Sequence, residues 1–303
     1  MSVSSDNFQQ YPYRIAISGG RGRLARLVAS FLRQEGYEVL LFSRREGEGF
    51  LPLEELFNPH LLATFDLLIH AAWSTVPFTS EEHQGQEDKR DLLLLDKILT
   101  TLALLSLKQE VPQLLFFSSA AVYGNTTEQA VQETAQLHPM SRYAKEKLLA
   151  ERMILQQATS HPSLRPLILR ITNVLGFLSD PRYPQGILPR IIAAAKNQEP
   201  LPIWGDGYCS KDYLWIDDFL LALQAALRKR LSGLFNLGSG EQYSLIDLVT
   251  AVEKALHLRI SLQYHPRYAW DIARSCIDSS KFSQATGWRA RCNIPEEIEK
   301  LLQ

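Results

Sequence analysis

The sequence lacks the features that mark several large classes of protein. Its 303 residues include only three cysteines, without CxxC spacing and without a histidine at metal-ligand distance: Cys209, Cys276 and Cys292. We therefore expect neither a metal site nor a disulfide framework, and a reducing cytoplasm fits. Lys and Arg total 32 against 33 Asp and Glu, which gives a formal net charge of -1. This balance predicts neither nucleic acid nor an anionic membrane as a partner.

Long apolar segments are also missing. No run reaches the about 18 residues that a membrane-spanning helix needs. The first residues, Met1–Gln10, are polar, whereas a signal peptide combines a cationic start with an apolar segment. We therefore expect no signal peptide, no membrane contact and a cytoplasmic protein.

Short apolar runs alternate with longer amphipathic stretches in the first half of the chain. Strands are predicted over Arg14–Ser18, Glu38–Phe42, Asp66–His70, Gln113–Ser118 and Pro166–Ile171, and helices over Arg23–Gln34, about Glu87–Ser106 and Met140–Gln157. Continuously apolar strands separated by helices indicate a parallel sheet that is covered on both faces. The predicted fold class is α/β, a doubly wound parallel Rossmann-type sheet with a smaller mixed C-terminal substrate lobe.

The alternation of apolar runs and amphipathic stretches becomes less regular after about Gly176, where several prolines interrupt the sequence. We predict a dinucleotide-binding domain over residues 1–175 and a substrate-binding lobe over 176–303. Two further strands are expected at Leu214–Ile216 and Leu234–Asn236, so the chain is expected to return to the first domain near 213–238.

A glycine-rich turn follows the first strand, with the spacing GxxGxxA. It comprises Gly19, Gly20, Arg21, Gly22, Arg23 and Leu24, before Ala25. Small residues let backbone N–H groups approach a pyrophosphate at a helix N-terminus. The alternative is a glycine turn without a ligand. Arg21 is expected to be a second phosphate contact.

The end of the second strand bears on the choice of cofactor. An acidic residue there would bind the ribose 2′-hydroxyl of NAD, but the sequence has Ser43, Arg44 and Arg45 instead. Guanidinium groups suit a 2′-phosphate. We therefore favour NADP(H), with NAD(H) as the alternative; Arg44 and Arg45 could equally be solvated loop charges.

Tyr143 and Lys147 form a YxxxK pair on one face of the third predicted helix. A neighbouring ammonium group favours the phenolate, which lets a tyrosine exchange protons near neutral pH. The spacing alone is weak, since helix surfaces show it by accident. Support comes from the segment Ser118–Gly124, which follows the fourth strand and puts a hydroxyl group at the edge of the expected crevice.

These segments together resemble the extended short-chain dehydrogenase/reductase family, in its nucleotide-sugar epimerase, dehydratase and reductase branch. The resemblance covers nearly the whole chain. It rests on SGGRGRLA at the glycine turn, DLLIHAA at 66–72, SSAAVYG at 118–124, PMSRYAKEK at 139–147, LRITNVLG at 169–176, IWGDG at 203–207, KDYLWIDD at 211–218 and FNLGSG at 235–240.

The resemblance implies roles for individual residues. Ser119 would bind the reacting sugar oxygen, Tyr143 would be the general acid/base, and Lys147 would hold the nicotinamide ribose. The segment that lines the cofactor would be His70, Ala71 and Ala72, and the substrate would meet Trp73, Ser119, Ala120, Asn173 and Lys211. A core position is an equal alternative for His70, for Trp73 and for a buried Asn173 amide.

Three departures from the family pattern narrow the expected activity. The positions of the Asp-Glu pair of sugar 4,6-dehydratases are Ala120 and Ala121, which argues against water elimination. Lys211 replaces the arginine that binds the diphosphate and lacks its planar fork. The segment from Glu46 to Phe65 is short, as in the deoxysugar reductases of the family.

We therefore expect an NADPH-dependent reductase of a nucleotide-activated 4-keto-6-deoxyhexose. The alternative is a nucleotide-sugar 4-epimerase that retains its cofactor. A third hypothesis, a non-catalytic NADP(H)-binding protein, fits less well because such members usually lack the tyrosine or the lysine. The resemblance also implies a homodimer.

Overall fold

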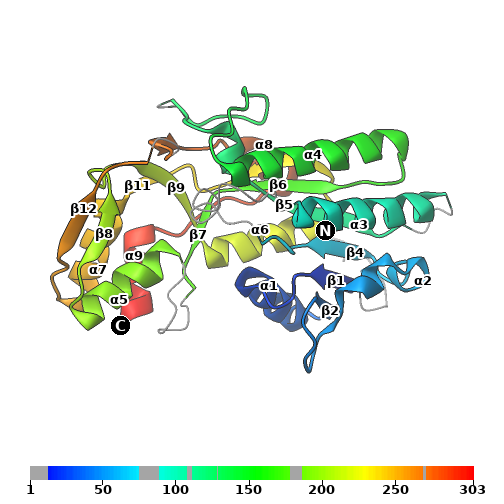
Figure 1. Cartoon of the computed structure of the whole chain (residues 1–303), viewed down its shortest axis with the longest axis horizontal. Helices are drawn as coiled ribbons and strands as arrows, with labels where there is room; N and C mark the ends of the chain where they lie inside the picture. The colour runs from blue at the N-terminus through cyan, green and yellow to red at the C-terminus, as the bar shows by residue number, and fades with distance from the viewer. Residues whose placement is uncertain (1–12, 75–88, 108–110, 128, 178–185, 269–270) are drawn as a thin grey trace, which may run out of the picture. The chain divides into compact units, whose positions relative to one another are not determined.

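The computed structural model describes residues 13–74, 89–107, 111–127, 129–177, 186–268 and 271–303 (Figure 1). The chain packs into two compact units. Unit 1 comprises Met1–Ser74, Glu87–Phe116 and Arg152–Leu167, and unit 2 comprises Thr75–Gln86, Phe117–Glu151 and Ile168–Gln303. These units are defined by how the chain packs, whereas the predicted boundary between residues 175 and 176 separates a cofactor-binding domain from a substrate-binding lobe. That boundary therefore stays a prediction.

Seven parallel strands form the main sheet, in the order β10-β6-β5-β4-β1-β2-β3. They are β1 (Arg14–Ser18), β2 (Glu38–Ser43), β3 (Leu51–Pro52), β4 (Leu67–His70), β5 (Gln113–Ser119), β6 (Leu167–Ile171) and β10 (Gly233–Leu237). The strand order reverses between β1 and β4, which is where doubly wound sheets bind ligands beyond the strand C-termini. The expected fold class is confirmed.

Unit 1 is built around β1, which pairs with β2 on one side and with β4 on the other. Ile15 and Ile17 are fully buried there. Helix α1 (Arg23–Gln34) buries the apolar stripe that its sequence predicts, including Val28 and Leu32. The unit is completed by η1 (Leu53–Phe57), α2 (Pro59–Leu62) and α3 (Arg90–Ser106). In Figure 1, α1 lies beside β1 and β2.

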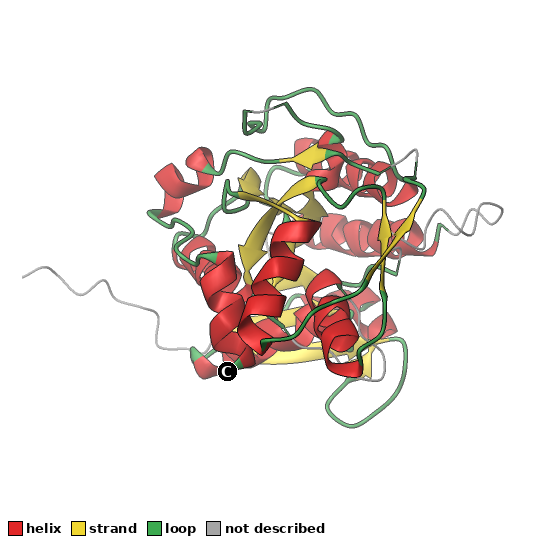
Figure 2. Cartoon of the chain, turned by 90° about the vertical axis from the view of Figure 1, so that its left-hand side faces the viewer, coloured by secondary structure: helices red, strands yellow, loops and turns green. Residues whose placement is uncertain are grey.

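Figure 2 shows the helices and strands of the chain by colour. In unit 2, β11 runs antiparallel to β9, whereas β13 runs parallel to it. A mixed sheet joins β11-β9-β13, with β7 also paired to β9, and a second small sheet joins β12 to β8. The strands are β7 (Asn173–Leu175), β8 (Leu201–Trp204), β9 (Ser210–Trp215), β11 (Gln242–Ser244), β12 (Leu262–His265) and β13 (Arg274–Ser275).

The helical elements of unit 2 are η2 (Ala120–Tyr123), α5 (Ile187–Asn197), α6 (Ile216–Arg228), α7 (Leu245–Leu256), α8 (Ser280–Thr286) and α9 (Ile294–Leu302), with the first part of α4 (Arg142–Ser160). A capping box begins α7, where Ser244 and Asp247 bond each other's backbone N–H groups.

The predicted elements differ from the observed ones mainly at their ends. Helix α4 begins two residues later than predicted, at Arg142, and α3 begins at Arg90. The strand predicted over Leu214–Ile216 is β9, which ends at Trp215, and Ile216 is the first residue of α6. Across the described ranges no helix is both long enough and apolar enough to cross a membrane.

Candidate active site

A cavity of about 570 Å³ lies in unit 1, at the point where the strand order reverses. Its lining includes many of the residues that the sequence assigned to cofactor binding: Gly19, Arg21, Gly22, Ser43, Arg44, Arg45, Ala71 and Ala72. The volume is typical of sites for small molecules and cofactors. Gly20, Arg23, Leu24 and His70 lie outside this lining.

The glycine turn packs directly against the segment after β4. Gly19 has φ +73, and a Cβ atom added there would overlap the backbone of Ala72. Gly22 donates its N–H to the Gly19 carbonyl over 2.8 Å and is the N-cap of α1. Glycine at the turn thus permits both the backbone conformation and the close approach. The free N-terminal end of α1 suits an anion.

Arg21 is turned toward the chain after β2. Its Nε donates to the Arg45 carbonyl over 3.3 Å, and its Nη2 donates to the Glu46 carbonyl over 2.5 Å. The guanidinium carbon lies 4.6 Å from the centre of the Phe50 ring. The expected phosphate contact by Arg21 stays a prediction, but these three contacts hold the loop that carries Arg44 and Arg45.

Basic side chains outnumber acidic ones around the cavity. Five of its lining residues are cationic, Arg21, Arg44, Arg45, Arg90 and Lys97, and two are acidic, Glu54 and Asp91. Asp91 is buried and accepts hydrogen bonds from the Ser74 N–H and hydroxyl groups. Ser43, at the end of β2, accepts the Arg45 N–H over 3.1 Å. The excess of positive charge favours a polyanionic ligand.

His70 is 1% exposed and belongs to the interior of unit 1. Its Nδ1 lies 2.8 Å from the Ser18 hydroxyl, which also accepts the N–H groups of Ala71 and Ala72. Trp73 lines the cavity and contacts the rings of His70 and Phe116 edge-on. His70 therefore shares the Ser18 hydroxyl with the segment Ala71–Ala72, and its predicted contact with the cofactor stays a prediction.

The apolar residues that line the cavity were not predicted from the sequence. They come from η1 and α3 and are Leu53, Phe57 and Leu94. Lys97 lies 5.4 Å from the Phe57 ring centre. An apolar patch beside a cationic one suits a planar base attached to phosphates. The residues present therefore fit a dinucleotide.

Unit 2 brings the three predicted catalytic residues together. Ser119 ends β5, and its hydroxyl shares a hydrogen bond with that of Tyr143 in the first turn of α4. Lys147 is 4% exposed, and its Nζ lies 5.8 Å from the centre of the Tyr143 ring. The same Nζ donates to the Phe117 carbonyl over 2.8 Å.

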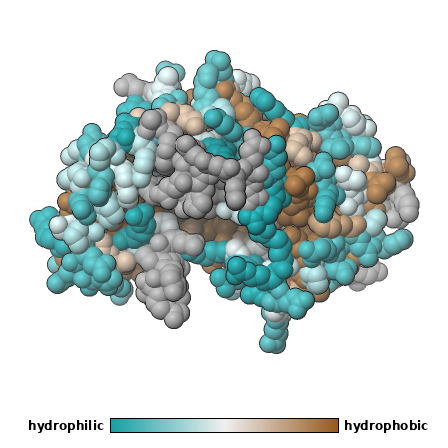
Figure 3. All heavy atoms as spheres, viewed as in Figure 1, coloured by the Kyte–Doolittle hydropathy of each residue, from teal (hydrophilic) through white to brown (hydrophobic). Residues whose placement is uncertain are grey.

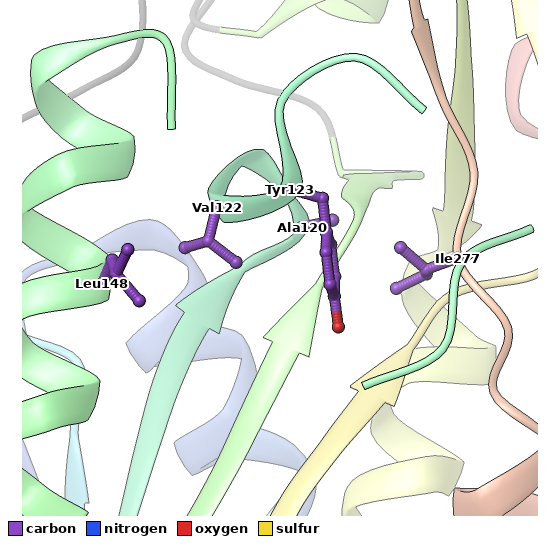
Figure 4. Close-up of a cluster of buried hydrophobic side chains, with 5 residues drawn as sticks. All are labelled: Ala120, Val122, Tyr123, Leu148 and Ile277. Carbon is purple, nitrogen blue, oxygen red and sulfur yellow. The ribbon is translucent and has the colours of Figure 1, made fainter. Parts of the chain in front are cut away.

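The turn after Ser119 packs into a cluster of buried apolar side chains. Figure 4 shows Val122 pointing toward Leu148 of α4, while the Tyr123 ring faces Ile277. Ala120 is buried in the same cluster. Ser119 is also the N-cap of η2, and its hydroxyl accepts the Ala121 N–H over 3.2 Å. Its side chain is thus held at the strand end.

The electrostatics of Tyr143 combine two opposing effects. Burial raises the pKa of its hydroxyl, and the hydrogen bond with Ser119 lowers it. Burial is the larger of the two effects, so the pKa of this hydroxyl is raised from its ordinary value.

The remaining predicted substrate residues lie on the strands of the mixed sheet. Asn173 begins β7 and donates its side-chain N–H to the Asp212 carbonyl over 3.1 Å. Lys211, in β9, pairs with Asp271 at 3.2 Å. Asp271, a partner for that cation, was missed by the sequence analysis. Among the described residues no group of three or more His, Cys, Asp or Glu side chains could hold a metal ion.

Comparisons with known proteins agree with this arrangement. The chain is 29% identical over 242 residues to UDP-glucose 4-epimerase of Dictyostelium discoideum, covering 73% of this chain and 70% of that protein. It is 28% identical over 320 residues to the Erwinia amylovora UDP-glucose 4-epimerase, covering 93% and 94%. A crystal structure of Thermus thermophilus UDP-glucose 4-epimerase in complex with NAD is similar, with a TM-score of 0.83 and 25% identity over 95% of this chain and 97% of that one.

The family comparison covers the glycine turn, the three predicted catalytic residues and the strands up to β10. Residues 15–238 match the model of the NAD dependent epimerase/dehydratase family. The doubly wound parallel sheet is the fold that the resemblance implied. We conclude that the chain is an enzyme of the NAD dependent epimerase/dehydratase family.

Proposed function

We propose that this protein is a 4-epimerase of a UDP-sugar. The observation that carries the proposal is the hydrogen-bonded Ser119–Tyr143 pair beside Lys147, in a chain whose relatives are UDP-glucose 4-epimerases. The sequence had favoured a reductase and kept the epimerase as the alternative. The relatives support the alternative better.

In this proposal Tyr143 removes the proton of the sugar 4-hydroxyl and later returns it. Ser119 hydrogen-bonds the reacting oxygen, and Lys147 favours the phenolate through its charge. A bound nicotinamide dinucleotide would accept and return the hydride. The glycine turn, Ala71 and Ala72 would hold that dinucleotide, and Lys211 and Asn173 would meet the substrate diphosphate.

The finer choice of cofactor is also a proposal. We propose that the protein accepts NADP(H), because the end of β2 offers Ser43 and two arginines and no carboxylate. A guanidinium group binds a phosphate with two directed donors. The relative from Thermus thermophilus is in complex with NAD, so the chain would depart from it at this position.

The two arginines and the missing carboxylate at the end of β2 keep the reductase as a second candidate. An enzyme that performs net reduction needs an exchangeable, reduced cofactor, and NADPH suits that role. In the reductase Tyr143 would donate its proton to the carbonyl oxygen, with Ser119 polarising it.

One experiment separates the two candidates. The purified protein is incubated with UDP-glucose, and formation of UDP-galactose is followed by chromatography, while the cofactor that co-purifies is identified by mass spectrometry. Epimerisation without added cofactor supports the epimerase. NADPH oxidation on adding a nucleotide-linked 4-keto-6-deoxy sugar, with no epimerisation, overturns it. A Tyr143→Phe protein with unchanged turnover would contradict both.

The homodimer implied by the resemblance is likewise proposed. Exposed leucines on α3 and directly after it support an apolar contact, since Leu93, Leu104 and Leu107 are 60%, 54% and 76% exposed. Figure 3 shows hydrophobic atoms among hydrophilic ones on the face it presents. Light scattering after size-exclusion chromatography tests the proposal, and a monomeric mass would contradict it.

A further inference from the structure

Three consecutive residues at the end of β5 are bonded to one face of α4. Ser119 shares a hydrogen bond with Tyr143, and the Phe117 carbonyl accepts from Lys147. Between them, the Ser118 hydroxyl donates to Glu151 Oε1 over 2.5 Å. The helix positions 143, 147 and 151 follow one another at intervals of four and therefore share a face. Only the third position, Glu151, has no role in the proposed reaction.

Glu151 is a buried carboxylate with a full set of partners. It is 1% exposed, and Arg170 of β6, 4% exposed, donates to it from Nε at 3.0 Å and from Nη2 at 2.7 Å. A paired, buried carboxylate of this kind is held in one place, because two fixed donors determine its plane. It is well suited to fix the hydroxyl group that donates to it.

The arginine is itself held from the other side. Arg170 Nη1 donates to the Tyr123 hydroxyl over 2.8 Å, and that hydroxyl donates to Asn236 Oδ1 over 2.7 Å. Asn236, in β10, is completely buried and donates to the Val131 carbonyl over 2.9 Å. The network therefore links β6, β10 and η2 to Glu151, and through Ser118 to the strand end between Phe117 and Ser119.

We propose that Glu151 is a positioning residue for the active site: by holding Ser118 it fixes the end of β5, so that Ser119 reaches Tyr143 and the Phe117 carbonyl orients Lys147. The inference rests on the proposed function, because it assigns a purpose to the alignment of those groups. It also differs from a purely structural role. A pair that served stability alone would affect unfolding and leave the titration of Tyr143 unchanged.

Ser118→Ala is the most direct test, because it removes the tether and leaves the Glu151–Arg170 ion pair intact. Ser244→Ala is the matched control in the same unit. It also removes a buried serine hydroxyl that donates to a carboxylate, here Asp247 Oδ2 at 2.7 Å, and it lies outside the proposed active site. Because Ser244 also caps α7, the free energy of unfolding is measured for both variants, so that a loss of stability is separated from a change of position.

Two readouts are needed. The first is kcat and KM for UDP-glucose, where we expect Ser118→Ala to lose about tenfold in kcat with KM changed less than about twofold, because small displacements of reacting groups cost rate. The second is the pKa of Tyr143 with bound cofactor, from NMR of protein labelled with ¹³C at the tyrosine Cζ and assigned with Tyr143→Phe. We expect this pKa to rise in Ser118→Ala and to stay unchanged in Ser244→Ala.

The outcomes separate the two proposals. If the wild-type protein converts no UDP-sugar, the proposed function fails, but the NMR comparison still decides the role of Glu151. If the Tyr143 pKa and kcat respond alike in Ser118→Ala and Ser244→Ala, the positioning role is overturned. A higher pKa with lower kcat in Ser118→Ala alone supports it.

Discussion

Replacing Arg21 with alanine tests whether this side chain binds the cofactor or braces the loop beside it. The change removes two hydrogen bonds to the carbonyls of Arg45 and Glu46 and the contact with Phe50. The bonds are solvent-exposed, so each contributes about 0.5–1 kcal/mol, and the cation–π contact contributes about 0.5–1 kcal/mol. Together these contacts stabilise the bound conformation of the loop by about 2 kcal/mol. Losing them would weaken the binding of a ligand that requires this conformation by up to about 30-fold.

With the proposed choice of cofactor, that ligand would be NADPH, whose 2′-phosphate would meet Arg44 and Arg45. We expect Arg21→Ala to weaken NADPH binding by about 10- to 30-fold and NADH binding by less than about threefold, measured by fluorescence titration at about 0.15 M salt to limit non-specific charge effects. Arg26→Ala, which removes an exposed arginine from α1, the helix after the glycine turn, is the control. Equal weakening for both nucleotides would refute the brace and favour a direct pyrophosphate contact.

Three further predictions concern cofactor binding, stability and pH. Gly19→Ala should abolish cofactor binding because its Cβ would overlap Ala72, whereas Gly36→Ala, at φ +89 with open space around it, should preserve binding in the same titration. Arg170→Met should lower the free energy of unfolding by about 3–5 kcal/mol, since it leaves Glu151 buried and uncompensated. Arg259→Met, at a side chain that is 93% exposed, should change it by less than about 0.5 kcal/mol in denaturant titrations. Burial raises the pKa of Asp212 to about 6, above its unfolded value. Its contribution to stability is therefore present at low pH and is lost as pH rises through about 6. Relative to Asp212→Asn, the wild-type protein should lose about 1 kcal/mol between about pH 5 and about pH 7.5, and a pH-independent difference would contradict this.

The fold was largely predictable from local pattern. β1 matches its prediction at both ends because an apolar run ends at a glycine turn, and α1 matches because its apolar stripe has the helical period. After Gly176 the sequence predicted only two of the strands. The short strands β11, β12 and β13 contain few continuous apolar residues, and pairing partners far apart in the chain determine them.

The candidate site was predictable where chemistry follows a fixed spacing, as for Tyr143 and Lys147. It was not predictable where two side chains meet through tertiary packing. Glu151 and Arg170 are 19 positions apart, and Lys211 and Asp271 are 60 apart. Nothing in either spacing distinguishes these pairs from other opposite charges. The orientation of Arg21 depended in the same way on the position of the loop after β2.

The bond between Ser18 and His70 bears on which nitrogen of the imidazole carries its hydrogen. The serine oxygen already accepts two backbone N–H groups, from Ala71 and Ala72, so its own hydrogen is directed to His70 Nδ1. The imidazole is thereby fixed in the tautomer that carries its hydrogen on Nε2. One hydroxyl group therefore joins the end of β1, the imidazole and the two alanine N–H groups that follow β4, so a single serine side chain holds the ends of two neighbouring strands together.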